Sequence, residues 1–375
     1  MTSMDLQSHI EREVASEASV RVLHDLVRTR SVTGTERPAV EVFVEHAGGL
    51  GYDAQIDGIG NGIATRGATS SDAIEIVLLG HIDTVSGEIP VRIENGVLHG
   101  RGSVDAKGPL AAFLLGAADA SLPPGVRVRV AAALGEEQDS PGAQYLRDRW
   151  SPDACFIGEP SGWDGVTLGY KGRLMARVEV CVPCGHSAGE DRSAPDIVMD
   201  WWREAVDLVT RLNGDRMSAF ETIRATVVDM RTESDGLSDR AWLRVSFRLP
   251  TWTTPEGLGP ELRLLSRGDG RVALRLEGFE LPHRSDRNDA VARSLSGAIR
   301  SCGGRPHPKL KTGTSDMNTV AATWGCPIAA YGPGDSGLDH SPEERLDLAE
   351  FAKSIRVVRE AVERLAQELV ETRGE

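Results

Sequence analysis

The chain has 375 residues, of which 40% are hydrophobic and 26% are charged, so it can bury a sizeable core and is long enough for two domains. Its formal net charge of −14 argues against a general nucleic-acid binder, because such proteins need a basic surface for the phosphate backbone. No apolar run approaches the roughly 20 residues that span a bilayer, and five scattered cysteines suit a reducing compartment, so we expect a cytoplasmic protein without a membrane span.

The first half of the chain is predicted to alternate helices with strands. Between residues 10 and 50, apolar spacing predicts two helices, and Pro38 should open the second. A third helix, from Leu110 to Ala120, is expected to begin near Asp105 or Pro109, and Ser140-Pro141 should cap a fourth. Short apolar runs predict buried strands at 74–79, 126–134 and 153–157. This alternation predicts an α/β domain with a mostly parallel, helix-covered sheet.

The pattern changes near residue 172, where strands of alternating polarity replace the buried runs. The predicted elements follow the order β-α-β-β-α-β and are expected at 173–182, 197–212, 224–230, 242–249, 260–265 and 271–279. This order indicates a ferredoxin-like α+β domain inserted into the first one. After a polar linker at 283–289, α/β character returns with a strand at 327–332 and a final helix through 348–369. We therefore expect a discontinuous domain of residues 1–171 and 284–375 and an inserted domain of residues 172–283.

Histidine and carboxylate side chains follow the predicted strands of the first domain, beside glycine turns or in polar loops. They are His81, Asp105, Glu136, Glu137, Glu159 and, beyond the insertion, His340. In open α/β proteins, ligands bind beyond the carboxyl ends of the strands. A set of this composition, with no cysteine, predicts a hydrolytic site that holds two metal ions.

Five of these residues also have an ordinary interpretation, which for His340 is that of a surface histidine. His81 and Asp83 could be a surface histidine and a loop aspartate, although a metal-bound imidazole usually donates its other N–H to a carboxylate. Asp105 could cap the following helix or bridge two cations about 3.5–4 Å apart. Glu136 and Glu137 could be solvated loop acids, or one could bind a metal while the other acts as the general base. Taken together in this order, the set is more specific than any of its members.

The order of these residues resembles that of the zinc-dependent exopeptidase and deacylase family, which includes acetylornithine deacetylase, succinyl-diaminopimelate desuccinylase and glutamate carboxypeptidase. The resemblance covers nearly the whole chain and implies that the inserted domain is a lid and dimerisation domain. It also implies the role of each residue. His81 and Glu159 would bind one metal ion, Glu137 and His340 would bind the other, and Asp105 would bridge the two ions. Asp83 would orient His81, and Glu136 would be the general base. Zinc is the expected metal, with cobalt as an alternative.

Two segments narrow the resemblance within that family. EPSGWDGVTLGYKGR (159–173) and KTGTSDMN (311–318) are similar to segments of hydrolases that release lysine or ornithine from LysW, an amino-group carrier protein, in lysine and arginine biosynthesis. The similarity implies cleavage of the amide that joins the amino acid to the γ-carboxyl of the carrier's terminal glutamate. An ordinary deacylase or dipeptidase that acts on free acyl-amino acids is the alternative. A metal-stabilised binding module without activity is a further one.

The resemblance also implies residues that contact the substrate. The protein would be a homodimer, and His186 of the inserted domain would stabilise the oxyanion in an active site, which in this family is often that of the neighbouring subunit. The alternative is that His186 is a turn residue. Arg248 would clamp a substrate carboxylate, unless it is an ordinary strand arginine. Ser315, Asp316 and Asn318 would contact the amino acid or hold a helix start. An acidic carrier should dock on a local basic rim, for which the candidates are Arg147, Arg149, Lys171, Arg173, Arg305, Lys309 and Lys311.

Overall fold

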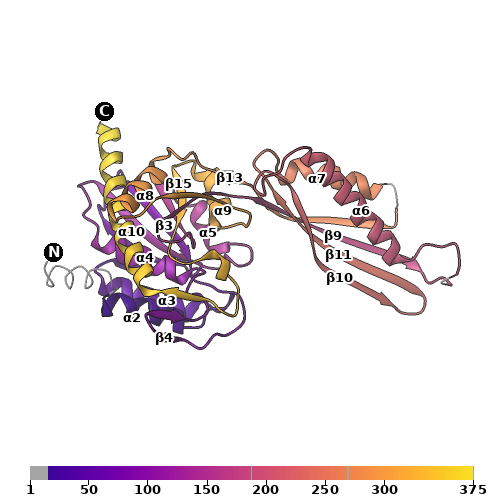
Figure 1. Cartoon of the computed structure of the whole chain (residues 1–375), viewed down its shortest axis with the longest axis horizontal. Helices are drawn as coiled ribbons and strands as arrows, with labels where there is room; N and C mark the ends of the chain where they lie inside the picture. The colour runs from indigo at the N-terminus through magenta and orange to yellow at the C-terminus, as the bar shows by residue number, and fades with distance from the viewer. Residues whose placement is uncertain (1–15, 187, 268–269, 375) are drawn as a thin grey trace. The chain divides into compact units, whose positions relative to one another are not determined.

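The computed structural model describes residues 16–374 except 187, 268 and 269. The chain divides into two compact units, whose elements are drawn in Figure 1. The first unit comprises Met1–Gly169, Ser285–Lys309 and Ser315–Glu375, and the second comprises Tyr170–Arg284 and Leu310–Thr314. Within the described ranges, no helix is both long enough and apolar enough to cross a membrane.

The main sheet of the first unit has a parallel centre and antiparallel edges. Seven of its strands lie in the order β1 (Asp53–Ile56), β2 (Gly62–Gly67), β6 (Val126–Ala133), β3 (Ile74–His81), β7 (Ala154–Gly158), β15 (Ile328–Tyr331) and β8 (Gly165–Tyr170). Strands β6, β3, β7 and β15 run parallel. Every residue of β3, β7 and β15 is buried, as their continuous apolar sequences predict. The predicted α/β sheet is confirmed.

Helices pack against this sheet and against one another. They are α2 (Glu17–Arg28), α3 (Arg37–Gly49), α4 (Lys107–Asp119), α5 (Pro141–Arg147), α8 (Ala290–Ser301), α9 (Asp316–Trp324) and α10 (Leu348–Gly374). Helix α4 is apolar all round and is buried from Lys107 to Ala117, because it packs against β3, β6, α2 and α10. Pro38 lies in the first turn of α3, as predicted. Residues 10–15 of the first predicted helix lie outside the described residues.

The structure corrects how two of these helices begin. Helix α4 starts at Lys107 with Ala106 at its N-cap, so the Asp105 side chain does not cap it. Ser140 occupies the N-cap position of α5, but its side chain makes no capping hydrogen bond because its backbone has φ 51° and ψ 44°. Pro141 instead begins this helix with a backbone angle that suits the first turn.

Several short elements of the first unit are not predicted by the sequence. A small sheet has the order β16 (Arg345–Asp347), β5 (Val97–His99) and β4 (Arg92–Glu94). The others in this unit are β1, β2, β8, α8 and a short 3₁₀ helix, η1 (Ser336–Leu338). Helix α9 is foreseen only through the alternative role of Ser315, Asp316 and Asn318 as a helix start. Strand β13 (His283–Arg284), in the second unit, and strand β14 (His307–Lys311), with residues in both units, are not predicted either. Strand β4 is exposed at every residue, so it lacks the apolar pattern on which strand prediction depends.

The second unit is the predicted ferredoxin-like domain. Its elements are β9 (Gly172–Pro183), α6 (Ala194–Asn213), β10 (Arg224–Ser234), β11 (Ser238–Leu249), α7 (Pro255–Arg267) and β12 (Val272–Glu280). The antiparallel sheet has the order β10-β11-β9-β12, which is the order that a β-α-β-β-α-β chain gives in this fold. Helix α7 starts five residues before the predicted Pro260, because the Thr254 hydroxyl accepts the Gly257 N–H and Pro255 opens the first turn.

Candidate metal centre

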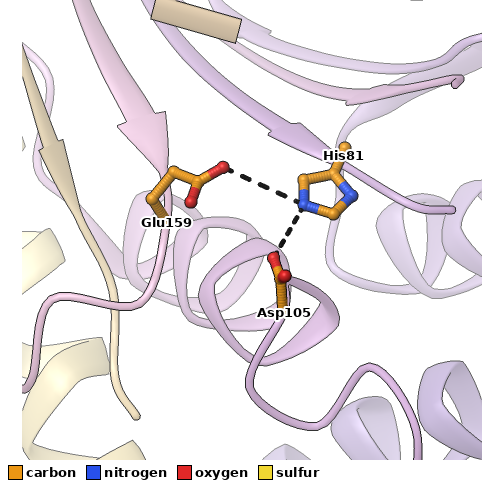
Figure 2. Close-up of side chains that lie close together, drawn as sticks. All are labelled: His81, Asp105 and Glu159. Carbon is orange, nitrogen blue, oxygen red and sulfur yellow. Dashed lines mark hydrogen bonds and ion pairs between the residues drawn. The ribbon is translucent and has the colours of Figure 1, made fainter. Parts of the chain in front are cut away.

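His81, Asp105 and Glu159 form the first of two side-chain groups at the end of the parallel sheet (Figure 2). The His81 Nε2 atom lies 3.1 Å from Asp105 Oδ1 and 3.9 Å from Glu159 Oε1. His81 is the last residue of β3, and Glu159 directly follows β7. These strands are parallel neighbours, with Gly80 opposite Gly158, so the side chains that follow them meet at the same sheet edge.

Asp105, Glu137 and His340 form the second group, which shares Asp105 with the first. His340 Nε2 lies 3.0 Å from Asp105 Oδ2 and 3.0 Å from Glu137 Oε2. The two oxygens of the Asp105 carboxylate therefore face different histidines. In each group, the candidate ligand atoms lie within 4.8 Å of one another.

The electrostatics of these groups fit the binding of cations. The buried Glu137 Oε1 atom has no hydrogen-bond partner among the described residues. Burial raises the pKa of Glu136 well above its ordinary value, and the Glu159 carboxylate adds to this effect, although His81 opposes it. Hydrogen bonds with Asp105 and Glu137 raise the pKa of His340 to about 10. The carboxylates that raise these pKa values would also stabilise divalent cations. Imidazole nitrogens and carboxylate oxygens are suitable ligands for such ions.

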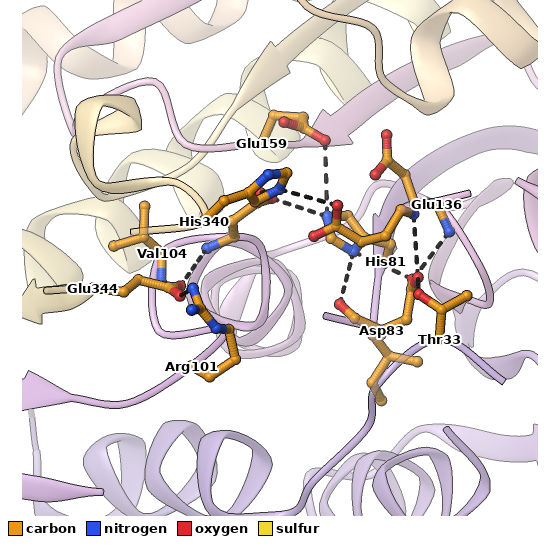
Figure 3. A network of polar contacts seen from close by, with 12 residues as sticks. Thr33, His81, Asp83, Arg101, Val104, Glu136, Glu159, His340 and Glu344 are labelled. Atoms are coloured by element: carbon orange, nitrogen blue, oxygen red, sulfur yellow. Dashed lines mark hydrogen bonds and ion pairs between the residues drawn. The ribbon is translucent and has the colours of Figure 1, made fainter. Parts of the chain in front are cut away.

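Asp83 links the first group to the loop that follows β6 (Figure 3). Its two carboxylate oxygens accept the backbone N–H groups of Glu136 and Glu137, at 3.0 and 3.1 Å. The Thr33 hydroxyl also donates to it, at 2.8 Å. His81 Nδ1 lies 3.1 Å from the Asp83 carbonyl oxygen and 3.4 Å from Oδ1, so both acceptors orient the ring. Thr33 was not among the predicted residues, because nothing in its local sequence connects it with Asp83.

Burial and hydrogen bonding act on Asp83 in opposite directions. The side chain is fully buried, which by itself would raise its pKa. Hydrogen bonds from His81, Thr33 and the Glu137 backbone overcome this effect and hold the pKa of Asp83 below its ordinary value. Asp83 is therefore an ionised anchor at neutral pH.

The predicted substrate residues lie in both units. Ser315 and Asn318 form a capping box at the start of α9, in which Ser315 Oγ accepts the Met317 N–H and Asn318 Oδ1 accepts the Ser315 N–H. Asp316 is buried in the first turn of the same helix. Holding a helix start is thus one role of this segment, and its contact with a substrate stays a prediction.

His186 and Arg248 belong to the second unit. His186 is exposed, and its Nδ1 atom accepts the Ala188 N–H at 3.1 Å. Arg248 lies near the end of β11, where its Nη1 atom donates to Thr314 Oγ1 at 3.1 Å. The roles proposed for both residues stay predictions.

One member of the predicted basic rim, Lys171, is not available for docking. Lys171 is only 1% exposed, and its ammonium group donates to the carbonyl oxygens of Ala219 and Thr222. Arg173 forms an ion pair with Glu280. The prediction that Lys171 belongs to an exposed rim is wrong, because the fold uses its charge internally. Arg173 is partly exposed, so its place in the rim stays a prediction.

The chain belongs to peptidase family M20/M25/M40, whose sequence profile matches residues 77–364. It is therefore a metallohydrolase, in agreement with the two groups described above. Solved structures of the same fold include aminopeptidase PepT from Bacillus cereus and the metallo-carboxypeptidase Sso-CP2 from Sulfolobus solfataricus. Each has a TM-score of 0.75 and 18% sequence identity, over 94% of this chain and 100% of the other. At this identity the similarity demonstrates the fold alone.

Relatives with higher sequence identity to this chain are described by a specific activity within the family. The chain is 42% identical to the LysW-lysine hydrolase of Deinococcus radiodurans, over 93% of this chain and 98% of that protein. It is 38% identical to a putative LysW-lysine/LysW-ornithine hydrolase of Thermococcus kodakarensis, over 94% of this chain and 93% of that protein. It is also 26% identical to the LysW-lysine/LysW-ornithine hydrolase of Saccharolobus solfataricus, over 96% of this chain and 99% of that protein.

Proposed function

We propose that this protein hydrolyses the amide that links lysine, ornithine or a related amino acid to the terminal glutamate γ-carboxyl of a LysW-type carrier protein. The main support is the pair of ligand groups that share Asp105, in a chain whose full-length relatives are described as LysW-lysine hydrolases. Such a reaction would be the final step of lysine or arginine biosynthesis on the carrier. We place it in the cytoplasm.

The proposed metal ligands are those predicted from the sequence. His81 and Glu159 would hold one ion, Glu137 and His340 the other, and Asp105 both. Zinc is the proposed metal and cobalt the alternative, since both accept imidazole and carboxylate donors. When bound, such ions lower the pKa of water and polarise the amide carbonyl. We assign residues 1–171 and 284–375 to the catalytic domain and residues 172–283 to an inserted lid and dimerisation domain.

Glu136 is the proposed general base. Burial raises its pKa, which suits a carboxyl group that must both take and return a proton near neutral pH. It would take a proton from the attacking water and return it to the amine nitrogen as the C–N bond breaks. Asp83 would keep Glu136 in place through the backbone N–H, and Arg248 would pair with a carboxylate of the substrate. Ser315, Asp316 and Asn318 would contact the released amino acid.

The substrate proposal is tested with carrier proteins that are separately loaded with lysine, ornithine and other amino acids. The purified protein should release lysine or ornithine from the carrier much faster than it cleaves free acetyl-ornithine or acetyl-lysine. Mass spectrometry of the carrier, before and after incubation, measures the loss of the amino acid. Equal kcat/KM on carrier-linked and free acyl-amino acids would instead identify an ordinary deacylase.

The proposal of a homodimer in which His186 acts on the partner subunit's site is tested by subunit complementation. His186→Ala and Glu136→Gln should each be nearly inactive alone. In a mixed dimer, one site would combine an intact Glu136 with an intact His186 from the other chain. Co-expression of the two variants should therefore restore about one quarter of the wild-type activity. Half of the dimers are mixed, and one of the two sites in each mixed dimer is functional. No recovery in a verified mixed dimer would place His186 outside the partner's site.

A further inference from the structure

Glu344 is a buried carboxylate that contacts the segment carrying Asp105. It lies four residues after His340 and is 1% exposed. Its Oε1 atom accepts the backbone N–H groups of Val104, at 2.9 Å, and Asp105, at 3.1 Å. Its Oε2 atom accepts Arg101 Nη1 at 2.7 Å (Figure 3). One side chain thus satisfies two backbone donors and one cation.

These contacts connect two segments that are 240 residues apart in the sequence. Glu344 directly precedes β16, which pairs with β5, and its carbonyl oxygen accepts the Gly100 N–H at 3.3 Å. Arg101 is anchored in turn by donating its Nε–H to the Gly87 carbonyl oxygen at 3.1 Å. The segment from Gly100 to Asp105 is therefore held to the segment that carries His340 by both backbone and side-chain contacts.

The proposed metal centre depends on how these two segments are aligned. The Asp105 oxygens lie 3.1 Å from His81 and 3.0 Å from His340, so a displaced Asp105 backbone would alter both distances. His340 has φ 59°, a conformation that non-glycine residues rarely adopt and that surrounding contacts must maintain. The contacts of Glu344 act on both segments at once.

We propose that Glu344, paired with Arg101, is a positioning residue that sets the metal affinity of the two ligand groups that share Asp105. This inference rests on the proposed metal centre. Glu344 would not contact the metal or the substrate, since its oxygens already accept backbone and guanidinium donors. It would act by keeping Asp105 between the two histidines. Hydrogen-bond partners of metal ligands commonly have effects of this kind.

The test replaces Glu344 with glutamine and titrates the metal-free full chain with Co²⁺, following visible absorption and heat. A glutamine oxygen can accept the two backbone N–H groups, but its NH₂ group then faces the donors of Arg101. We expect Co²⁺ binding to weaken by about 10–100-fold for at least one ion. The double variant Glu344→Gln/Arg101→Gln should recover most of this loss, because the second glutamine, in place of the arginine, would offer an acceptor to that NH₂ group.

A matched control separates positioning from general stability. Glu75 is also a buried carboxylate held by arginines, with Arg127 at 2.5 Å and Arg129 at 3.2 Å. It lies near the start of β3, about 20 Å along the strand from His81. Glu75→Gln should lower the melting temperature and leave Co²⁺ affinity unchanged.

The inference is overturned if Glu344→Gln binds Co²⁺ as tightly as the wild type, or if Glu75→Gln weakens binding equally. A wild type that binds two Co²⁺ ions but does not cleave loaded carriers would refute the carrier function alone. Weakened Co²⁺ binding by Glu344→Gln would support the positioning role even then. A wild type that binds no Co²⁺ would overturn both the metal centre and this inference.

Discussion

Replacing Glu136 with glutamine is expected to lower kcat by about 100-fold or more, because glutamine keeps the shape of the side chain but cannot accept a proton. The surrounding loop should keep its conformation, since Asp83 binds the Glu136 backbone N–H rather than its side chain. Both metal ions should stay bound, because Glu136 belongs to neither ligand group. The measurements are kcat on lysine-loaded carrier and the metal content of the purified variant.

The matched control for this variant is Asp139→Asn. Asp139 lies in the same loop and is exposed, so the substitution makes the same acid-to-amide change three residues away from Glu136. Its kcat should equal that of the wild type. Full turnover by Glu136→Gln with both metals bound would refute the assignment of the general base.

Replacing Asp105 with alanine is expected to have the largest effect on metal content, because its two oxygens serve both groups. The variant should lose both ions, and its kcat should fall by more than about 100-fold. Loss of a residue that only hydrogen-bonds to a metal ligand lowers activity by up to about 100-fold, so loss of a shared ligand should cost more. His340→Ala removes a donor from the second group alone, so it should lose one ion and keep the other. Elemental analysis and Co²⁺ titration of each variant measure these losses.

A surface histidine provides the control for His340→Ala. His307 is exposed on β14 and lies 3.7 Å from Asp164, outside both ligand groups. His307→Ala should bind two ions and turn over normally. An Asp105→Ala variant that binds two ions with wild-type affinity would exclude the shared carboxylate.

The elements with continuous or strictly alternating apolar sequences could be predicted from the sequence. Strand β3 is buried on both faces, and β9 buries alternate residues, so both have a pattern that the sequence reveals. The small sheet of β4, β5 and β16 could not be predicted, because its short strands are partly exposed and β5 pairs with a strand from the far end of the chain. The Ser315/Asn318 capping box at the start of α9 agrees with the predicted alternative that these residues hold a helix start.

The residues that hold the candidate metal ligands in place are harder to predict from the sequence than the ligands themselves. Asp83 and His81 are two residues apart, which suggests a local interaction. Thr33 lies 50 residues from Asp83, and Glu344 lies 240 residues from Val104, although it is only four residues after His340. Neither has a local pattern that distinguishes it from an ordinary polar residue. Only the fold brings them to their partners.

The sequence alone determined which kinds of donor this protein carries and that they follow buried strands, because apolar runs and the polar residues after them are local features of the chain. The tertiary structure decided which donors meet. Parallel pairing of β3 with β7 places His81 beside Glu159, and the loop before α4 inserts Asp105 between His81 and His340. Such pairings depend on strand order and loop closure over hundreds of residues, which no local pattern encodes.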